Sequence, residues 1–177
     1  MKTNTEADVR SDTAIRVMAL FFVAIMFLAF TTDPIRTGTN EGDRAPPLTG
    51  MAYNGSGWTN FDINDYFDTN WTAGDLDGQW LLVDFMDTDC PFCVRSAEEV
   101  GQNADYFMKL QGDWQGPIVN FVASATELDI PGHETSRAEI EAFRDKSGQE
   151  SCAGNSCAAR DGSSHGFVYI DDIDQDN

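Results

Sequence analysis

Cys90 and Cys93 are separated by two residues in the segment Cys90-Pro-Phe-Cys93. A two-residue spacer keeps two cysteine sulfurs close enough to form a disulfide at the start of a helix. It also lets the second thiol break a mixed disulfide that has formed on the first. The pair therefore predicts thiol–disulfide exchange, with Cys90 as the attacking thiol and Cys93 as the resolving thiol.

The residues on either side of the pair predict a strand followed by a helix. Residues 80–86 form a short apolar run broken only by Asp84, as in a strand that is buried on both faces of a parallel sheet. Pro91 suits the first position of a helix. The apolar face of that helix consists of Cys93, Ala97, Val100, Ala104 and Phe107. Cys90 falls outside this face, at the helix tip, where free N–H groups and the helix dipole stabilise a thiolate.

The strand, the tripeptide Val83-Asp84-Phe85, the Cys-Pro-Phe-Cys motif and the helix resemble the active-site segment of thioredoxin-like oxidoreductases. The resemblance implies that a buried carboxylate six residues before the first cysteine, here Asp84, relays a proton to the second cysteine. Burial alone predicts a raised pKa for Asp84, which suits proton exchange near neutral pH. A carboxylate that is merely satisfied by backbone donors is the alternative interpretation of Asp84.

Residues 42–46, Gly-Asp-Arg-Ala-Pro, are similar to the start of the membrane-tethered TlpA/ResA-like and peroxiredoxin-like branches of this family. The resemblance implies an α/β fold over residues 51–177, with a thioredoxin-like βαβ core and an added N-terminal hairpin. A complete fold of this type continues into a cis-proline loop, two antiparallel strands and a final helix. No such residues follow the last predicted strand, so we expect a domain that is incomplete at its C-terminus.

Two further strands and one helix are predicted after the first helix, which should end near Gly112. The strands are expected at 117–124 and 166–170, where apolar residues run together. Ser136 and Glu139 form a capping-box pattern that predicts the start of a short helix.

One departure from the family lies directly before Cys90, where the usual residue is Trp and this chain has Asp89, with Asp87 two residues earlier. Carboxylates beside Cys90 disfavour its thiolate and oppose the helix dipole and Arg95. A less stable dithiol form lowers the reduction potential, so we expect a reducing couple. The alternative is that Asp89 is no more than a helix N-cap.

Cys152 and Cys157 lie in a segment rich in Gly and Ser, and we expect a local disulfide between them. A second redox pair that relays electrons to Cys90 and Cys93 stays open as an alternative. The four cysteines could also bind zinc, but the strand-then-helix setting favours redox chemistry. We therefore predict no metal and no cofactor.

Two other activities and one inert role stay open. A thiol peroxidase usually carries Thr-x-x-Cys, whereas Asp87 holds the threonine position and Thr88 lies too close to Cys90. A copper-delivery module of thioredoxin fold would add a distant histidine, for which His133 and His165 are the candidates. Isolated surface histidines are the more ordinary explanation of both. A redox-inert interaction domain would show no exchange with a dithiol.

The N-terminal part predicts attachment to a membrane. Residues 1–13 are polar and expected to be disordered, and residues 14–32 contain an unbroken apolar core at 17–30. This pattern favours an uncleaved signal anchor, a single transmembrane helix, over a cleaved signal peptide. Residues 33–50 then form a linker. The signal-like layout places the N-terminus in the cytoplasm and the cysteines on the other side of the membrane.

The chain is strongly acidic, with 30 Asp and Glu residues against 11 Lys and Arg residues and a net charge of −19. Such a surface repels nucleic acid, which is excluded as a partner, and it repels anionic lipid headgroups as well. The expected partners are protein thiols and disulfides, and the family resemblance implies an electron donor in the membrane.

Overall fold

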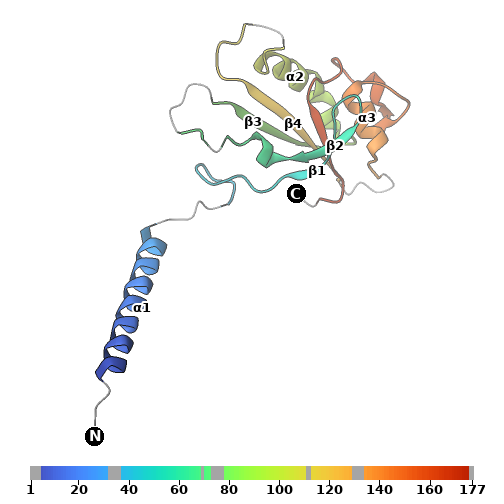
Figure 1. The fold of residues 1–177 in the computed structure, drawn as a ribbon. Coiled ribbons are helices and arrows are strands. Elements are labelled where there is room, and N and C mark those ends of the chain that lie inside the picture. Colours follow the sequence, from blue (N-terminus) through green and yellow to red (C-terminus); the bar gives the residue numbers. More distant parts are fainter. Residues whose placement is uncertain are drawn as a thin grey trace. The chain divides into compact units, whose positions relative to one another are not determined.

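The computed structural model describes residues 5–31, 37–68, 70–72, 78–110, 113–128 and 134–175. The chain divides into two compact units, Met1–Pro46 and Pro47–Asn177. The first unit contains helix α1 (Thr5–Thr31), and the second contains the sheet and the helices α2 and α3 (Figure 1). The Cys-x-x-Cys motif lies in the second unit.

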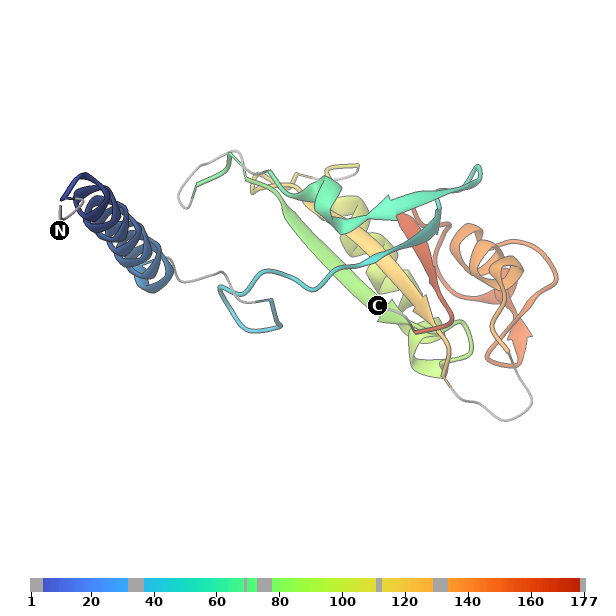
Figure 2. The same ribbon diagram turned by 60° about the horizontal axis from the view of Figure 1, so that its bottom comes forward.

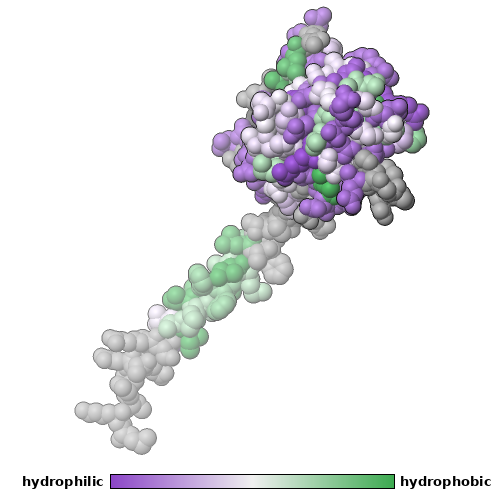
Figure 3. All heavy atoms as spheres, turned by 90° about the vertical axis from the view of Figure 1, so that its right-hand side faces the viewer, coloured by the Kyte–Doolittle hydropathy of each residue, from purple (hydrophilic) through white to green (hydrophobic). Residues whose placement is uncertain are grey.

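Helix α1 begins at Thr5, so residues 5–13, which were expected to be disordered, are helical. The side chains described in α1, residues 12–28, are exposed, and Figure 3 shows the apolar ones in green. Within the described part of the chain, no helix has both the length and the apolar character needed to cross a membrane. The structure thus gives no support to the signal anchor expected over 14–32.

The second unit is built on a five-stranded mixed sheet with the strand order β2-β1-β7-β4-β3. Its strands are β1 (Thr49–Tyr53), β2 (Trp58–Asp62), β3 (Trp80–Met86), β4 (Val119–Thr126) and β7 (Val168–Asp172). Strands β3, β4 and β7 run parallel, whereas β1 is antiparallel to both of its neighbours. Figure 2 shows the long β3 and β4 side by side. The expected α/β class is confirmed.

The expected order of strand, helix and strand is found, with shifted boundaries. Helix α2 (Pro91–Phe107) follows β3, and α3 (Arg137–Asp145) follows β4. Helix α2 ends before Gly112 because Lys109 adopts a left-handed backbone conformation, with φ of 61°. Strands β4 and β7 each begin two residues later than expected. The predicted capping box is present, with Ser136 as the N-cap of α3 and Glu139 as its partner.

The N-terminal hairpin begins earlier than expected, because β1 already includes Thr49 and Gly50 from the predicted linker. Asn54 makes the turn between β1 and β2, and its side-chain oxygen accepts from the N–H groups of Ser56 at 2.9 Å and Gly57 at 3.2 Å. The 3-10 helix η1 (Ile63–Tyr66) follows the hairpin.

The hydrophobic core lies between the sheet and the helices α2 and α3. It includes Ala97, Ala104, Phe121, Ala123, Ala125, Ile140, Phe143 and Tyr169. Alanines on both α2 and β4 let the helix pack close to the sheet. The β3–β4 register sets Asp84 beside Ala123 and Met86 beside Ala125, and side chains at such registered positions share one face. Asp84 therefore lies on the face that α2 covers, next to the first turn of that helix.

A small two-stranded unit lies between α3 and β7. It consists of β5 (Ser151–Cys152) and β6 (Asn155–Ser156) and is followed by the 3-10 helix η2 (Cys157–Ala159). Its turn contains Ala153 and Gly154, which both have positive φ.

Candidate functional site

Cys90 is the N-cap of α2, and its Sγ accepts a hydrogen bond from the N–H of Cys93 at 3.4 Å. The N–H of Cys90 in turn donates to the carbonyl of Asp87 at 3.2 Å. The interpretation of Asp89 as the N-cap is therefore wrong, because the helix begins one residue later. Cys90 and Cys93 are both free thiols and both half-buried. The sulfur of Cys90 thus lies where the free N–H groups of a helix stabilise negative charge.

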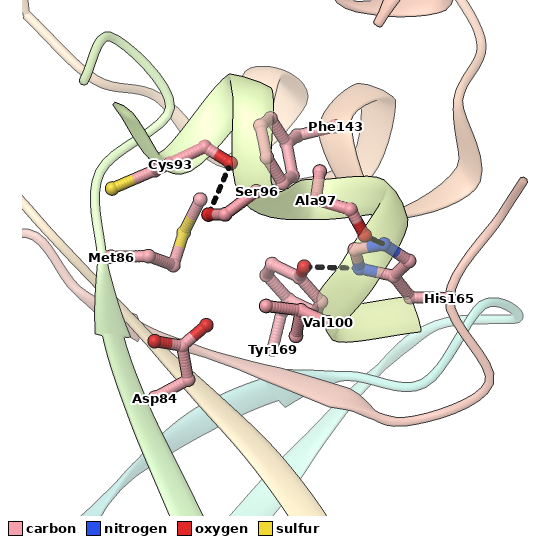
Figure 4. A pocket seen from close by; sticks show the side chains of 9 residues that line it. All are labelled: Asp84, Met86, Cys93, Ser96, Ala97, Val100, Phe143, His165 and Tyr169. Atoms are coloured by element: carbon pink, nitrogen blue, oxygen red, sulfur yellow. Dashed lines mark hydrogen bonds between the residues drawn. The ribbon is translucent and has the colours of Figure 1, made fainter. Parts of the chain in front are cut away.

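A small cavity lies below Cys93, between α2 and the sheet (Figure 4). It is lined by Asp84, Met86, Cys93, Ser96, Ala97, Val100, Phe143, His165 and Tyr169. Its volume of about 30 Å³ is enough for a water molecule. Asp84 extends from β3 toward this cavity, so the structure brings together the two groups between which the sequence predicts proton transfer.

Burial strengthens proton binding at both Cys93 and Asp84. It raises the pKa of Cys93 to about 11, although a backbone hydrogen bond from Asp87 acts in the opposite direction. The neighbouring Cys90 and the charge of Asp84 raise the pKa of Cys93 further. Burial also raises the pKa of Asp84, in the direction expected from the sequence. The charge of Asp84 is thus one of several causes that keep a proton on Cys93, whereas burial is the cause that keeps one on Asp84.

The carboxylates of Asp87 and Asp89 are buried and bind backbone N–H groups. One oxygen of Asp87 accepts from the N–H of Asp89 at 2.6 Å, and the other accepts from the N–H of Leu128 at 2.5 Å. Asp89 accepts from the N–H of Ala153 at 2.7 Å. These contacts join the loop before Cys90 to the end of β4 and to the β5–β6 turn. The expected influence of the two charges on the Cys90 thiolate stays a prediction.

Cys152 and Cys157 are joined by a disulfide, as the sequence favoured. They are only 1% and 0% exposed. Exchange requires access of a thiolate to a disulfide sulfur, so this burial disfavours an electron relay through the pair. The disulfide instead closes the turn that holds the N–H of Ala153 toward Asp89.

His165 and Tyr169 both line the cavity, although the sequence indicated His165 only as a possible copper ligand and did not single out Tyr169. His165 was expected on the surface, but this expectation is wrong, because it is 3% exposed. Its Nδ1 meets the hydroxyl of Tyr169 at 2.5 Å, and its Nε2 meets the carbonyl of Ala97 at 2.9 Å. The mid-helix Gly101 was the available signal, since a Cβ there would come within 3.0 Å of the His165 ring.

The geometry does not favour a copper site. Both ring nitrogens of His165 are used in hydrogen bonds, and His133 lies outside the described residues. Over the part of the chain that is described, no three His, Cys, Asp or Glu side chains cluster in a way that could hold a metal ion.

Neither a protein-family model nor a curated protein sequence matches the chain.

Proposed function

We propose that this protein is a thioredoxin-like thiol–disulfide oxidoreductase that acts on protein thiols and disulfides. One arrangement carries the proposal: two free thiols at the first turn of α2, directly after a parallel strand, with Asp84 and Cys93 lining one cavity. This arrangement supplies an attacking thiol, a resolving thiol and a proton acceptor.

In the reducing direction, the thiolate of Cys90 attacks one sulfur of a substrate disulfide. The first substrate sulfur leaves and takes a proton from water, and a mixed disulfide remains on Cys90. Cys93 then transfers its proton to the carboxylate of Asp84 and attacks the sulfur of Cys90. The second substrate sulfur leaves and is protonated by water. The substrate ends as two thiols and the protein as a disulfide, so electrons balance without a cofactor. The same steps in reverse oxidise a dithiol.

An exposed aromatic ring between the two cysteines supports a protein substrate. Phe92, between the two cysteines, is 73% exposed, and the guanidinium of Arg95 lies 4.7 Å from its ring centroid. Exposed aromatic rings of this kind are enriched at protein interfaces.

We further propose that the domain works outside the cytoplasm. The Cys152–Cys157 disulfide supports this, because structural disulfides persist mainly in oxidising compartments. The apolar run at 17–30 supports attachment to a membrane, where an electron donor would also lie. Fractionation of cells after alkaline extraction tests this location, since a soluble protein would leave the membrane pellet.

The chemistry is tested by trapping the mixed disulfide. Each single-cysteine variant, Cys93→Ser and Cys90→Ser, is mixed with a peptide disulfide, and the products are identified by mass spectrometry. Cys93→Ser should accumulate a stable adduct on Cys90, because nothing resolves it. Cys90→Ser, the matched control, should react far more slowly through the partly shielded Cys93. Equal reaction of the two variants, or no reaction of either, would refute the proposed function.

A further inference from the structure

The hydrogen bonds of His165 fix the position of its proton. The carbonyl of Ala97 can only accept, so the Nε2 atom that meets it at 2.9 Å must carry the hydrogen. In the neutral ring Nδ1 is then an acceptor. The hydroxyl of Tyr169 therefore donates to Nδ1, at 2.5 Å. With its proton used in this way, the Tyr169 oxygen can offer only lone pairs to its other neighbours.

The same oxygen belongs to a side chain that lines the cavity shared by Asp84 and Cys93 (Figure 4). A group that can only accept stabilises proton donors, such as a thiol, a carboxylic acid or a water molecule. It disfavours a thiolate or a carboxylate in the same space, because it cannot donate to either. The cavity therefore favours the protonated forms of the two groups that exchange a proton.

We propose that Tyr169 and His165 are a positioning pair that presents an acceptor, and no donor, to the cavity and so keeps a proton on Asp84 and Cys93. The role rests on the proposed oxidoreductase function, in which it serves the regeneration of the dithiol. One thiolate of an incoming dithiol attacks the sulfur of Cys90, the Cys90–Cys93 bond breaks, and Cys93 leaves. The carboxylic acid of Asp84 then gives its proton to the departing Cys93 sulfur. The second thiolate of the dithiol attacks the mixed disulfide, releases Cys90 and leaves the donor as a disulfide.

The surroundings keep His165 neutral, as this role requires. Burial, with the charges of Arg160 and Arg144, lowers the pKa of His165 to about 4. Both guanidiniums are held by backbone carbonyls, Arg160 by Phe143 at 2.7 Å and Arg144 by Phe167 at 2.8 Å. Besides His165, the ionisable groups that act on Tyr169 include these two arginines, Asp84 and Cys93. The ring of His165 therefore stays an acceptor at Nδ1 across the neutral range.

Gly101 on α2 is an independent observation that supports a role for the Tyr169–His165 pair. A Cβ at this position would lie 3.0 Å from Cδ2 and 3.1 Å from Nε2 of His165. Glycine inside a helix carries a stability cost relative to alanine. That cost is explained if the helix must let the imidazole approach the carbonyl of Ala97.

The test is an NMR titration of the reduced full chain, with ¹³C labels in Asp and Cys side chains and no substrate present. Tyr169→Phe keeps the ring and removes the acceptor, so the proton affinity of the Asp84–Cys93 pair should fall about threefold to tenfold. His165→Phe frees the Tyr169 hydroxyl to donate into the cavity, so the affinity should fall further. Tyr106→Phe, the same change at an exposed position on α2, should leave the titration unchanged.

Gly101→Ala provides a second route if the His165 variant does not fold, because it displaces the ring without removing it. It should also lower the proton affinity of the pair. An unchanged or increased affinity in Tyr169→Phe would overturn the positioning role. This outcome is separate from failure of the proposed function, because the titration needs no exchange and trapping at Cys90 is measured independently.

Discussion

The contact between Asp89 and the β5–β6 turn gives a sharp prediction for stability. Asp89 is 7% exposed, and its carboxylate accepts from the N–H of Ala153 at 2.7 Å. A hydrogen bond to a charged group contributes about 1.5 to 3 kcal/mol to stability. Removing the carboxylate loses this contribution, but it also removes the cost of desolvating a buried charge, which offsets part of the loss. We expect Asp89→Ala to lower the free energy of unfolding by about 2 kcal/mol. Asp89→Asn should cost less, because an amide oxygen still accepts.

The stability provided by the Asp89–Ala153 hydrogen bond should depend on the Cys152–Cys157 disulfide. Cys152 and Cys157 are separated by five positions, and closing so short a loop contributes about 2 kcal/mol in the chain-entropy description. If the disulfide holds the N–H of Ala153 toward Asp89, the contact weakens once both cysteines are serine. Asp89→Ala should then cost at least about 0.5 kcal/mol less in that background than in the wild type.

Urea unfolding followed by circular dichroism gives the four free energies of this cycle. Asp113→Ala is the control, because it removes an exposed carboxylate from the same acidic chain and so reports relief of charge repulsion alone. The reasoning would be refuted if Asp89→Ala cost no more than Asp113→Ala. It would also be refuted if the costs of Asp89→Ala and of the double cysteine change were strictly additive.

Three further changes should have measurable effects. In the folded protein the pKa of His165 is lowered to about 4 from 6.5. The free energy of unfolding should therefore be highest above pH 6.5 and fall by up to about 3 kcal/mol as the pH falls to 4. Urea titrations at each pH should show that His165→Phe loses this dependence. The pKa of Asp84 is raised in the folded protein, so its favourable contribution to the free energy of unfolding is present at low pH and is lost as the pH rises. Asp84→Asn should therefore stabilise the protein at pH 7 while slowing resolution of the mixed disulfide in stopped-flow assays, and unchanged resolution would exclude it as proton acceptor. Ser136→Ala removes the capping box of α3 and should cost about 1 kcal/mol in thermal or urea unfolding, with Ser136→Asp retaining most of the stability.

Local patterns in the sequence predicted the part of the fold that carries the cysteines. The boundaries of β3 and the start of α2 at Pro91 were correct, because an apolar run and a proline act over a few residues. The capping box was correct for the same reason. The position of β7 between β1 and β4 depends on pairing between distant segments, so no local pattern indicated it.

Long-range contacts also explain what was missed at the site. His165 lies in a polar segment and so looks like a surface residue. In the structure it is buried, and its Nε2 forms a hydrogen bond with the carbonyl of Ala97, 68 positions away. The effect of the Asp87 and Asp89 charges on Cys90 stays a prediction, but no local pattern indicated that these carboxylates also bind N–H groups 41 and 64 positions away. Sequence patterns indicate which groups are chemically able to act, but not which distant backbone donors occupy them.

The most direct test of the proposed chemistry is the reduction potential of the Cys90–Cys93 pair in the full chain. The protein is equilibrated with glutathione mixtures and alkylated, and the peptides containing Cys90–Cys93 and Cys152–Cys157 are quantified separately by mass spectrometry. The proposed function predicts one two-electron transition for Cys90 and Cys93, at or below about −270 mV if the nearby carboxylates make the couple reducing. The buried Cys152–Cys157 disulfide should stay oxidised throughout. If Cys90 and Cys93 form no disulfide with each other at any potential, the assignment as an oxidoreductase is contradicted.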